Sequence, residues 1–366
     1  MGEPLGFGII GAGMISAWHA AGIEAHPDGH LVAIASRSRD RAEKFAAEHR
    51  CAVVSDWREM LRRDDIHAVC ICTPSGLHAE QGIAAACAGK HVLVEKPMAI
   101  TLRGCDEMIR AARDNGTRLG VIFQKRTDEA PNRMKRAVEE GVFGKIFFGD
   151  ASIKYWRNQA YYGSGDWRGT WALDGGGCTM NQGIHGIDLL LHIMGDVKSI
   201  YARMDTVAHD IEVEDIAIAL LKYRNGAYGR LQTATAVNPG QGVYIEVNGT
   251  LGTASLADDR ITGWAVSDSK EALAVEAVMD TNFSPRVCTH TRGPLTERSG
   301  AASSAASIAT RGHIIQMANF IGAVRTGEKL ICSGEEGRRS VHLIMALYES
   351  ARRKEEVPLE EITGDP

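Results

Sequence analysis

The sequence has 366 residues, of which 44% are hydrophobic and 24% charged, with a formal net charge of −5 at pH 7. This balance is typical of an ordinary globular protein with room for two domains, and it excludes disordered and fibrous classes. The chain also lacks the basic balance of a protein that binds a phosphate backbone, so no nucleic-acid partner is expected.

Three further classes are disfavoured by the sequence. The amino terminus shows no basic segment followed by a hydrophobic stretch and a cleavage site, and no run approaches about 18 apolar residues. We therefore expect no membrane partner and a cytoplasmic location. The eight cysteines form no C-x-x-C pair, which favours reduced thiols over a disulfide framework or a zinc site, and no metal site is predicted.

The first 124 residues alternate short apolar runs with segments of helical pattern. Strands are predicted at 5–10, 31–36, 68–73, 91–95 and 118–124, with helices at 15–25, 40–49, 77–88 and 101–115. Strands that alternate with helices indicate βαβ units, and right-handed crossovers between them build a parallel sheet. Residues 1–124 are therefore predicted to form a doubly wound α/β domain of the Rossmann type.

The pattern changes after residue 124. Helices are predicted at 131–140, 182–194, 313–326 and 335–353, extended structure at 145–155, and strands at 199–208, 213–223, 227–236, 242–247, 253–257 and 261–266. Consecutive strands separated by turn signals such as Asn225-Gly226 indicate a largely antiparallel sheet. Residues 125–366 are thus predicted to form an α+β domain with an open sheet, in which the Ser- and Ala-rich stretch 284–312 makes a long excursion or lid.

The first candidate site is a glycine motif after the first predicted strand. Gly11-Ala12-Gly13 joins that strand to a helix, which is the context that a dinucleotide-binding loop requires. Gly11 permits a tight turn, Gly13 lets the backbone approach a pyrophosphate at the helix N-terminus, and Ser16 replaces the usual third glycine. A glycine turn without a ligand is disfavoured by the surrounding βαβ pattern. The residues assigned to the cofactor here are Gly11, Gly13, Met14 and Ile15.

The end of the second predicted strand should contact the ribose of a bound dinucleotide. Ser36 and Arg37 stand there, and no Asp or Glu is present that would bind a 2′-hydroxyl and repel a 2′-phosphate. A hydroxyl beside a guanidinium suits a phosphate instead, so the interpretation is NAD(P) binding with a preference for NADP. The alternative is that Arg37 and Arg39 only form a solvated helix entry.

Glu95-Lys96-Pro97 follows the fourth predicted strand, at the sheet edge where ligands of such folds bind. Lys96 can donate to a substrate oxygen there, and burial beside a cationic nicotinamide would lower its pKa toward the working pH. Pro97 restricts Lys96 to extended geometry and makes the bond between them a candidate for the cis form. Taken alone, this tripeptide is common on protein surfaces.

The segment from Asp174 to Asp188 is the last candidate. Its triple glycine lets the backbone pass close to a ligand, and Asn181 and His185 are four residues apart, so that they share a helix face. Asp188 is placed to orient His185 or to cap neighbouring backbone. A lone histidine is more often a core residue, but this one shares its face with an amide just after a glycine-rich loop.

The loop before this segment is rich in aromatic and arginine side chains, namely Tyr155, Trp156, Arg157, Tyr161, Tyr162, Trp167, Arg168 and Trp171. Aromatic faces and guanidinium groups suit the C–H faces and hydroxyls of a carbohydrate, or a diphosphate. Some of these side chains are expected instead to stabilise a domain or subunit interface.

Taken in this order, the motifs resemble the Gfo/Idh/MocA family (glucose–fructose oxidoreductase, inositol dehydrogenase and rhizopine catabolism). The resemblance covers nearly the whole chain and includes the segments 11–15, 72–78, 89–97, 175–188, 249–252 and 334–339. It implies a Rossmann domain and a second domain whose open sheet often forms a homodimer or homotetramer interface. It also implies hydride transfer between a sugar or polyol carbon and nicotinamide C4.

The resemblance also implies roles for individual residues. Lys96 matches the family's catalytic lysine and His185 its active-site histidine, and the residues expected at the cofactor are Thr73, Pro74, His78, Glu95, Lys96 and Gln124. The expected substrate-binding residues are Lys96, Arg157, Trp167, Arg168, Asn181 and His185. Many relatives carry Asp in place of Asn181. Because an amide cannot take a proton, Lys96 is expected to transfer the proton while His185 hydrogen-bonds the reacting oxygen.

The run Trp167–Trp171, together with Asn181-Gln182, is most similar to the branch with nucleotide-sugar 3-dehydrogenases. The expected function is an NAD(P)-dependent dehydrogenase or reductase acting on a ring carbon, C3 in that branch, of a sugar, sugar derivative or nucleotide sugar. Two alternatives stay open: an NAD-retaining glycosidase that works through transient C3 oxidation, and a non-catalytic regulator that senses the dinucleotide.

Overall fold

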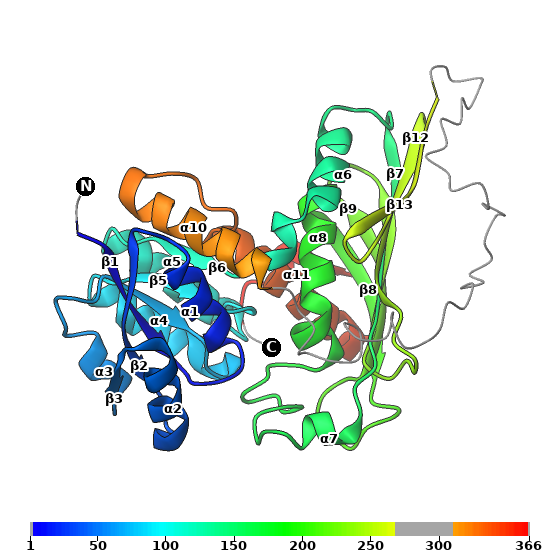
Figure 1. The fold of residues 1–366 in the computed structure, drawn as a ribbon. Coiled ribbons are helices and arrows are strands. Elements are labelled where there is room, and N and C mark those ends of the chain that lie inside the picture. Colours follow the sequence, from blue (N-terminus) through cyan, green and yellow to red (C-terminus); the bar gives the residue numbers. More distant parts are fainter. Residues whose placement is uncertain (1–2, 268–309, 365–366) are drawn as a thin grey trace.

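The computed structural model describes residues 3–267 and 310–364, which form two domains side by side, each built on one sheet (Figure 1). The strand orders are β3-β2-β1-β4-β5-β6 in the first sheet and β13-β12-β11-β7-β10-β9-β8-β14 in the second. The excursion predicted at 284–312 lies almost entirely outside the described residues.

The first sheet is wholly parallel and has the doubly wound order expected of a Rossmann domain. Its strands are β1 (Leu5–Ile10), β2 (Gly29–Ala35), β3 (Ala52–Val54), β4 (Ala68–Ile71), β5 (His91–Val94) and β6 (Leu119–Val121). Its helices are α1 (Ser16–Glu24), α2 (Arg39–His49), α3 (Trp57–Met60), α4 (His78–Cys87) and α5 (Leu102–Asp114). The strand order reverses between β1 and β4, which opens a crevice at their carboxyl ends.

Two elements of this domain were missed in the sequence. Strand β3 has three residues, of which two are exposed, and helix α3 has four, so neither has a long enough apolar pattern to be recognised. The prediction that Glu95-Lys96-Pro97 follows the fourth strand was therefore wrong by one, because these residues follow β5.

The second sheet is largely antiparallel, as predicted, but β7 and β10 pair in parallel. Its strands are β7 (Ile146–Lys154), β8 (Val197–Asp205), β9 (Ile216–Tyr223), β10 (Tyr228–Ala234), β11 (Gly242–Gly249), β12 (Gly252–Ala257), β13 (Arg260–Val266) and β14 (Val357–Pro358). The strand predicted at 213–223 begins only at Ile216. Glu214 and Asp215 come before that start, and both are buried, with carboxylates that accept backbone N–H groups of nearby loops.

One face of the second sheet carries the helices α6 (Glu129–Glu139), α8 (Ile184–Met194) and α11 (Gly334–Arg353) (Figure 1). Successive residues of a strand point to opposite faces, and the alternating burial of β9 turns Ile218 and Leu220 away from the core. Leu220 is 62% exposed and Tyr228, on the neighbouring β10, 58%. The outer face of the second sheet thus exposes several apolar side chains among charged ones such as Arg203 and Arg230. Among the described helices, none is both long and apolar enough to cross a membrane.

Helix α10 (Arg311–Thr326) packs on the first domain, although it comes after residue 124, where the sequence predicted the boundary between the domains. It packs against α1, and Phe320 joins the core beneath the first sheet, where its ring lies 6.4 Å from that of Phe7 (Figure 1). The range 125–366 therefore includes one helix that completes the first domain.

A cluster of charged side chains stabilises the segment that connects the first domain to the second. Arg126, just after β6, donates two hydrogen bonds of 2.8 Å to the carboxylate of Asp188 on α8, and its guanidinium lies 3.2 Å from Glu336 on α11. The expectation that Asp188 orients His185 or caps nearby backbone was wrong, because its carboxylate is taken by Arg126 and by the Ser340 hydroxyl.

Candidate functional site

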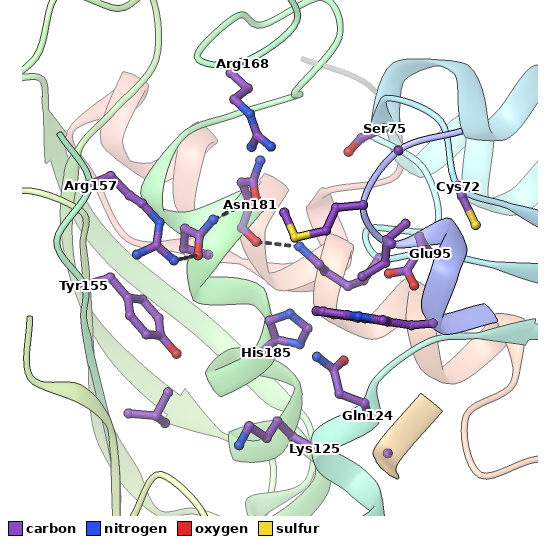
Figure 2. A pocket seen from close by; sticks show the side chains of 18 of the residues that line it. Cys72, Ser75, Glu95, Gln124, Lys125, Tyr155, Arg157, Arg168, Asn181 and His185 are labelled. Carbon is purple, nitrogen blue, oxygen red and sulfur yellow. Dashed lines mark hydrogen bonds between the residues drawn. The ribbon is translucent and has the colours of Figure 1, made fainter. Parts of the chain in front are cut away.

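A cavity of about 2600 Å³ includes the cleft between the domains, at the carboxyl ends of the first sheet's strands, and continues over residues of the second sheet such as Arg230, Tyr244 and Ser255. Every residue that the sequence assigned to a cofactor or substrate lines it: Gly11, Gly13, Met14, Ile15, Ser36, Arg37, Thr73, Pro74, His78, Glu95, Lys96, Gln124, Arg157, Trp167, Arg168, Asn181 and His185. In Figure 2, Gln124 of the first domain lies toward His185 of the second.

The glycine loop leaves the start of α1 open to this cleft. Gly11 has a φ of +106°, and a Cβ there would lie 2.6 Å from the carbonyl oxygen of Cys72, so no other residue fits. Among residues 3–267 and 310–364, nothing lies within 4 Å of a Cβ built on Gly13, and no side chain caps the beginning of α1. The N-terminal amides of the helix therefore have no side-chain acceptor, an arrangement that suits a bound anion.

Ser36 and Arg37 follow β2, and they differ in whether the side chain already has a hydrogen-bond partner in the protein. The Ser36 hydroxyl accepts the amide of Ser38 at 3.2 Å, whereas Arg37 is exposed and makes no hydrogen bond or ion pair within the described residues. Arg39 does not line the cleft and pairs with Glu43 at 2.6 Å. Sequence reasoning missed Arg41, which lines the cleft one helical turn after Arg37.

The Lys96-Pro97 bond is cis, and the His78 side chain holds the turn around it. The ring nitrogens of His78 lie 2.8 Å from the carbonyl oxygen of Pro97 and 2.9 Å from that of Thr73. Since both nitrogens face these carbonyls, His78 supports the turn and has none left to bind a ligand. The Thr73 hydroxyl likewise donates to Gln81, at 2.7 Å.

Glu95 anchors the other side of this turn. One of its oxygens lies 2.9 Å from Nε2 of His19, on α1, and 3.2 Å from Nε2 of His313, on α10. Burial acts to raise the pKa of Glu95, but the hydrogen bonds of the two histidines outweigh it and hold the pKa well below its ordinary value. Glu95 is thus an ionised, internally satisfied carboxylate. Sequence reasoning missed both histidines, and the only available signal was the position of His19 on the helix that follows the glycine motif.

Lys96 links the two domains. Its Nζ donates to the backbone carbonyl of Asn181 at 2.9 Å. Burial lowers the pKa of Lys96, the negative charges of Glu95 and Asp174 oppose that shift, and the positive charges of Arg168 and Arg157 favour it. The lysine therefore combines a fixed position with a pKa below that of a free amine.

The helix predicted at 182–194 is preceded by a π-helical segment, η3 (Cys178–Gly183), so Asn181 and His185 do not share one continuous α-helical face. Gly177 leads into this segment, and a Cβ there would lie 1.8 Å from the carbonyl oxygen of Glu214. The buried Glu214 carboxylate accepts the amides of Gly177 and Thr179, both at 2.9 Å, and so fixes η3. Glu214, at the start of a predicted strand, gave no sequence signal for this role.

His185 lies in the first turn of α8. Its Nδ1 is buried and makes no hydrogen bond within the described residues, and the ring meets that of Phe123 edge-on at 6.2 Å. Burial lowers the pKa of His185 well below its ordinary value, and the charge of Lys96 acts in the same direction. His185 is therefore a neutral imidazole at physiological pH.

The Asn181 side chain is held by its neighbours. Its Nδ2 donates to Asp174 at 2.5 Å, and its Oδ1 accepts from Gln182 at 3.1 Å. Asp174 is only 2% exposed and also accepts the amide of Gly169 at 2.9 Å. Burial raises the pKa of Asp174 to about 6.

Two arginines complete the wall formed by the second domain (Figure 2). Arg157 donates to Gln182 at 2.8 Å, and Arg168 donates to the Tyr161 hydroxyl at 2.5 Å while its guanidinium lies 4.4 Å from the centre of the Trp167 ring. Of the aromatic residues noted in the sequence, Trp156, Tyr162 and Trp171 do not line the cleft. Tyr162 is buried and hydrogen-bonded to Thr235 within the second domain.

Comparisons with known proteins agree with this architecture. A family described as an oxidoreductase family with an NAD-binding Rossmann fold matches residues 5–123, and the GFO/IDH/MocA C-terminal domain matches residues 132–255. The chain is 27% identical to myo-inositol 2-dehydrogenase of Thermotoga maritima, over 98% of this chain and 99% of that protein.

Among the similar solved structures, two match over nearly their whole lengths. The WlbA dehydrogenase from Bordetella pertussis, in complex with NADH and UDP-GlcNAcA, is 32% identical with a TM-score of 0.83, covering 97% of this chain and 98% of that one. Levoglucosan dehydrogenase, in complex with NADH and levoglucosan, is 25% identical with a TM-score of 0.80, covering 98% of this chain and 100% of that one.

The buried Asp174 carboxyl predicts a pH dependence of stability. Because its pKa rises from 3.8 to about 6, the folded protein holds this proton more tightly than the unfolded chain. The resulting stabilisation is present at acidic pH and is lost as the pH rises through 6. Asp174→Asn removes this dependence, so the unfolding free energy of the variant relative to wild type should rise by about 2 kcal/mol between about pH 4.5 and pH 7. Urea unfolding at both pH values measures this, and a constant difference would contradict it.

Proposed function

The chain belongs to the Gfo/Idh/MocA family of NAD(P)-dependent oxidoreductases, and we propose that it transfers hydride between nicotinamide C4 and a ring carbon of a sugar, sugar derivative or nucleotide sugar. The observation that carries the proposal is that Gly13, Lys96 and His185, which lie far apart in sequence, line one cleft. That combination places an anion-binding helix terminus, a basic amine and a neutral imidazole around a single space.

Residues of the first domain fit a dinucleotide. The uncapped start of α1 beside Gly13 suits the pyrophosphate. The Gln124 side chain lines the cleft, and its buried Oε1 has no partner within the described residues, so it can accept the amide of a carboxamide group. A nicotinamide bound there would supply the hydride acceptor or donor.

We favour NADP as the cofactor. Ser36 and Arg37 stand where an acidic residue would select against a 2′-phosphate, and Arg41 lines the same cleft. The two crystal structures compared above contain NADH. The preference therefore rests on these three side chains of the present chain.

Lys96 is the proposed acid–base residue. Its lowered pKa makes a neutral amine available to take the proton of a substrate hydroxyl, and the Asn181 carbonyl fixes its position. In the reverse direction the ammonium returns that proton. The buried, unpartnered Nδ1 of His185 favours the tautomer with hydrogen on Nε2, which can donate to the reacting oxygen.

The second domain is the proposed substrate site. Arg157, Trp167, Arg168 and Asn181 line its side of the cleft, and their guanidinium, indole and amide groups suit sugar hydroxyls or a diphosphate. We propose a ring hydroxyl at C3 as the group oxidised, because Trp167–Trp171 with Asn181 is similar to the nucleotide-sugar 3-dehydrogenase branch.

The outer face of the second sheet is the proposed interface of a homodimer or homotetramer. It exposes Phe148, Ile218, Leu220, Tyr228 and Tyr244, each at least 40% accessible. Exposed apolar side chains gathered on one sheet face are typical of a surface that a second subunit covers.

Replacing Lys96 by Met tests the central assignment. Removal of the amine should lower turnover at least about 100-fold with an active sugar substrate, while the dissociation constant for NAD(P)H, from nicotinamide fluorescence, stays within about twofold. Lys198→Met, an exposed lysine on β8, serves as the control. Unchanged turnover in Lys96→Met would refute the assignment. Accumulation of NAD(P)H with wild-type enzyme separates a dehydrogenase from a cofactor-retaining glycosidase.

Arg37→Ala tests the cofactor preference. Loss of a charged hydrogen bond to a 2′-phosphate should weaken NADPH binding by about 10- to 100-fold, with little change for NADH. Arg39→Ala is a matched control, because Arg39 pairs with Glu43 and does not line the cleft. Equal effects of Arg37→Ala on the two cofactors would argue against NADP selection by this residue.

Leu220→Glu tests the subunit interface. A charge in place of the most exposed of these apolar side chains should convert the dimer or tetramer into monomers, as measured by light scattering after size-exclusion chromatography. Val207→Glu provides the comparison, since Val207 is 59% exposed but lies outside the strands. An assembly that survives Leu220→Glu unchanged would place the interface elsewhere.

A further inference from the structure

Asn181 occupies the position where many relatives carry an acid, and its amide has a fixed orientation. An ionised carboxylate only accepts hydrogen bonds, so the NH₂ group of Asn181 must face Asp174. The amide oxygen then faces Gln182, whose Nε2 donates to it, and the backbone carbonyl of the same residue accepts from Lys96. Asp174 thus determines the orientation of the Asn181 side-chain amide in the cleft.

Asp174 is a carboxylate without a direct counter-ion. It comes immediately before the triple glycine and is almost fully buried, and from the part of the chain that the structure describes it accepts only the Asn181 amide and the Gly169 backbone amide. Within the described residues it makes no ion pair. Buried charges are normally paired. Here the cations that act on Asp174 through space are Lys96 and Arg168, which both line the cleft.

We propose that Asp174 is the acidic positioning residue of this active site, which orients the Asn181 amide and places a negative charge beside Lys96. The proposal rests on the function proposed above for Lys96. An Asp at position 181 would face Asp174 across the present 2.5 Å contact, and two carboxylates so close cannot both ionise. This chain can therefore hold one ionised carboxylate at positions 174 and 181 together. It carries that carboxylate at position 174, behind the amide of Asn181.

The charge of Asp174 has a defined target. Burial drives the pKa of Lys96 down, and Arg168 and Arg157 favour the same direction; Glu95 and Asp174 are the two carboxylates that oppose it, and neutral His185 also lies nearby. Glu95 is already engaged by two histidines. The negative charge that faces Lys96 from the second domain is that of Asp174. Its removal should leave Lys96 with a larger fraction of neutral amine.

The test measures the amine directly and needs neither substrate nor dinucleotide. The full chain is labelled competitively with acetic anhydride across a pH series, and peptide mass spectrometry follows Lys96, with exposed Lys198 as internal reference. The variants are Asp174→Asn and the exchange Asp174→Asn with Asn181→Asp. Asp166→Asn is the matched control, because Asp166 is a carboxylate in the same loop that is not buried.

Asp174→Asn should raise the labelling of Lys96 at pH 7 about threefold or more, since only the neutral amine reacts. The exchange variant again pairs one carboxylate with one amide, so its labelling should return toward that of wild type. Asp166→Asn should label as wild type. A merely structural role for Asp174 would not move this pH profile, because the amide introduced by Asp174→Asn can still accept from Gly169 and contact Asn181.

The proposal is overturned if Asp174→Asn labels as wild type, or if the exchange variant labels as Asp174→Asn does. Should Asp174→Asn fail to fold, Asp174→Ser carries the same expectation, because a hydroxyl can still accept from Gly169. The proposed function fails by a different result, namely the absence of dinucleotide binding or of turnover, and the labelling experiment depends on neither.

Discussion

The hydrogen bond from Lys96 to the backbone carbonyl of Asn181 joins the two domains at the point where their chemistry meets. Neither end of this bond is free to move. Lys96 follows Glu95, a buried carboxylate that contacts two histidines, and precedes a cis proline. Asn181 belongs to a π-helical segment whose amides are bound by the Glu214 carboxylate. The cleft therefore owes its geometry to polar groups buried behind it, as expected for a site whose first layer is fixed by a second.

Four buried carboxylates surround this centre, and the way each is satisfied separates them into two kinds. Asp188 accepts from a bidentate arginine and Glu95 contacts the ring nitrogens of two histidines, so basic side chains satisfy both, although burial also raises the pKa of Asp188. Glu214 and Asp174 accept from amides, with a tyrosine hydroxyl added at Glu214, and burial raises the pKa of both. Both are connected to the segment that carries Asn181. The two carboxylates of this set that have no basic side-chain partner among the described residues thus both support the segment that carries Asn181.

Much of this arrangement was predictable because local patterns carry it. The alternation of strands and helices revealed the parallel sheet, and the positions of Gly13, Lys96 and His185 revealed which edge becomes the cleft. Features that depend on distant partners were not predictable. Asp188 is bound by Arg126, 62 residues away, and Glu95 by His313, 218 residues away. The π-helical segment was hidden for the same reason, since it is held by a carboxylate from another part of the chain.

The return of α10 to the first domain bears on how the protein is made. Met317, Phe320 and Ile321 cover core residues of the first sheet, and His313 reaches Glu95 next to Lys96. These side chains emerge from the ribosome only after the strands β7 to β13 of the second sheet have been synthesised. The first domain consequently keeps an apolar surface uncovered until translation is nearly finished. The surroundings of Lys96 are therefore complete only once α10 has been synthesised. A chain that ends before α10 would lack both the apolar side chains that cover the first sheet and the contact of His313 with Glu95.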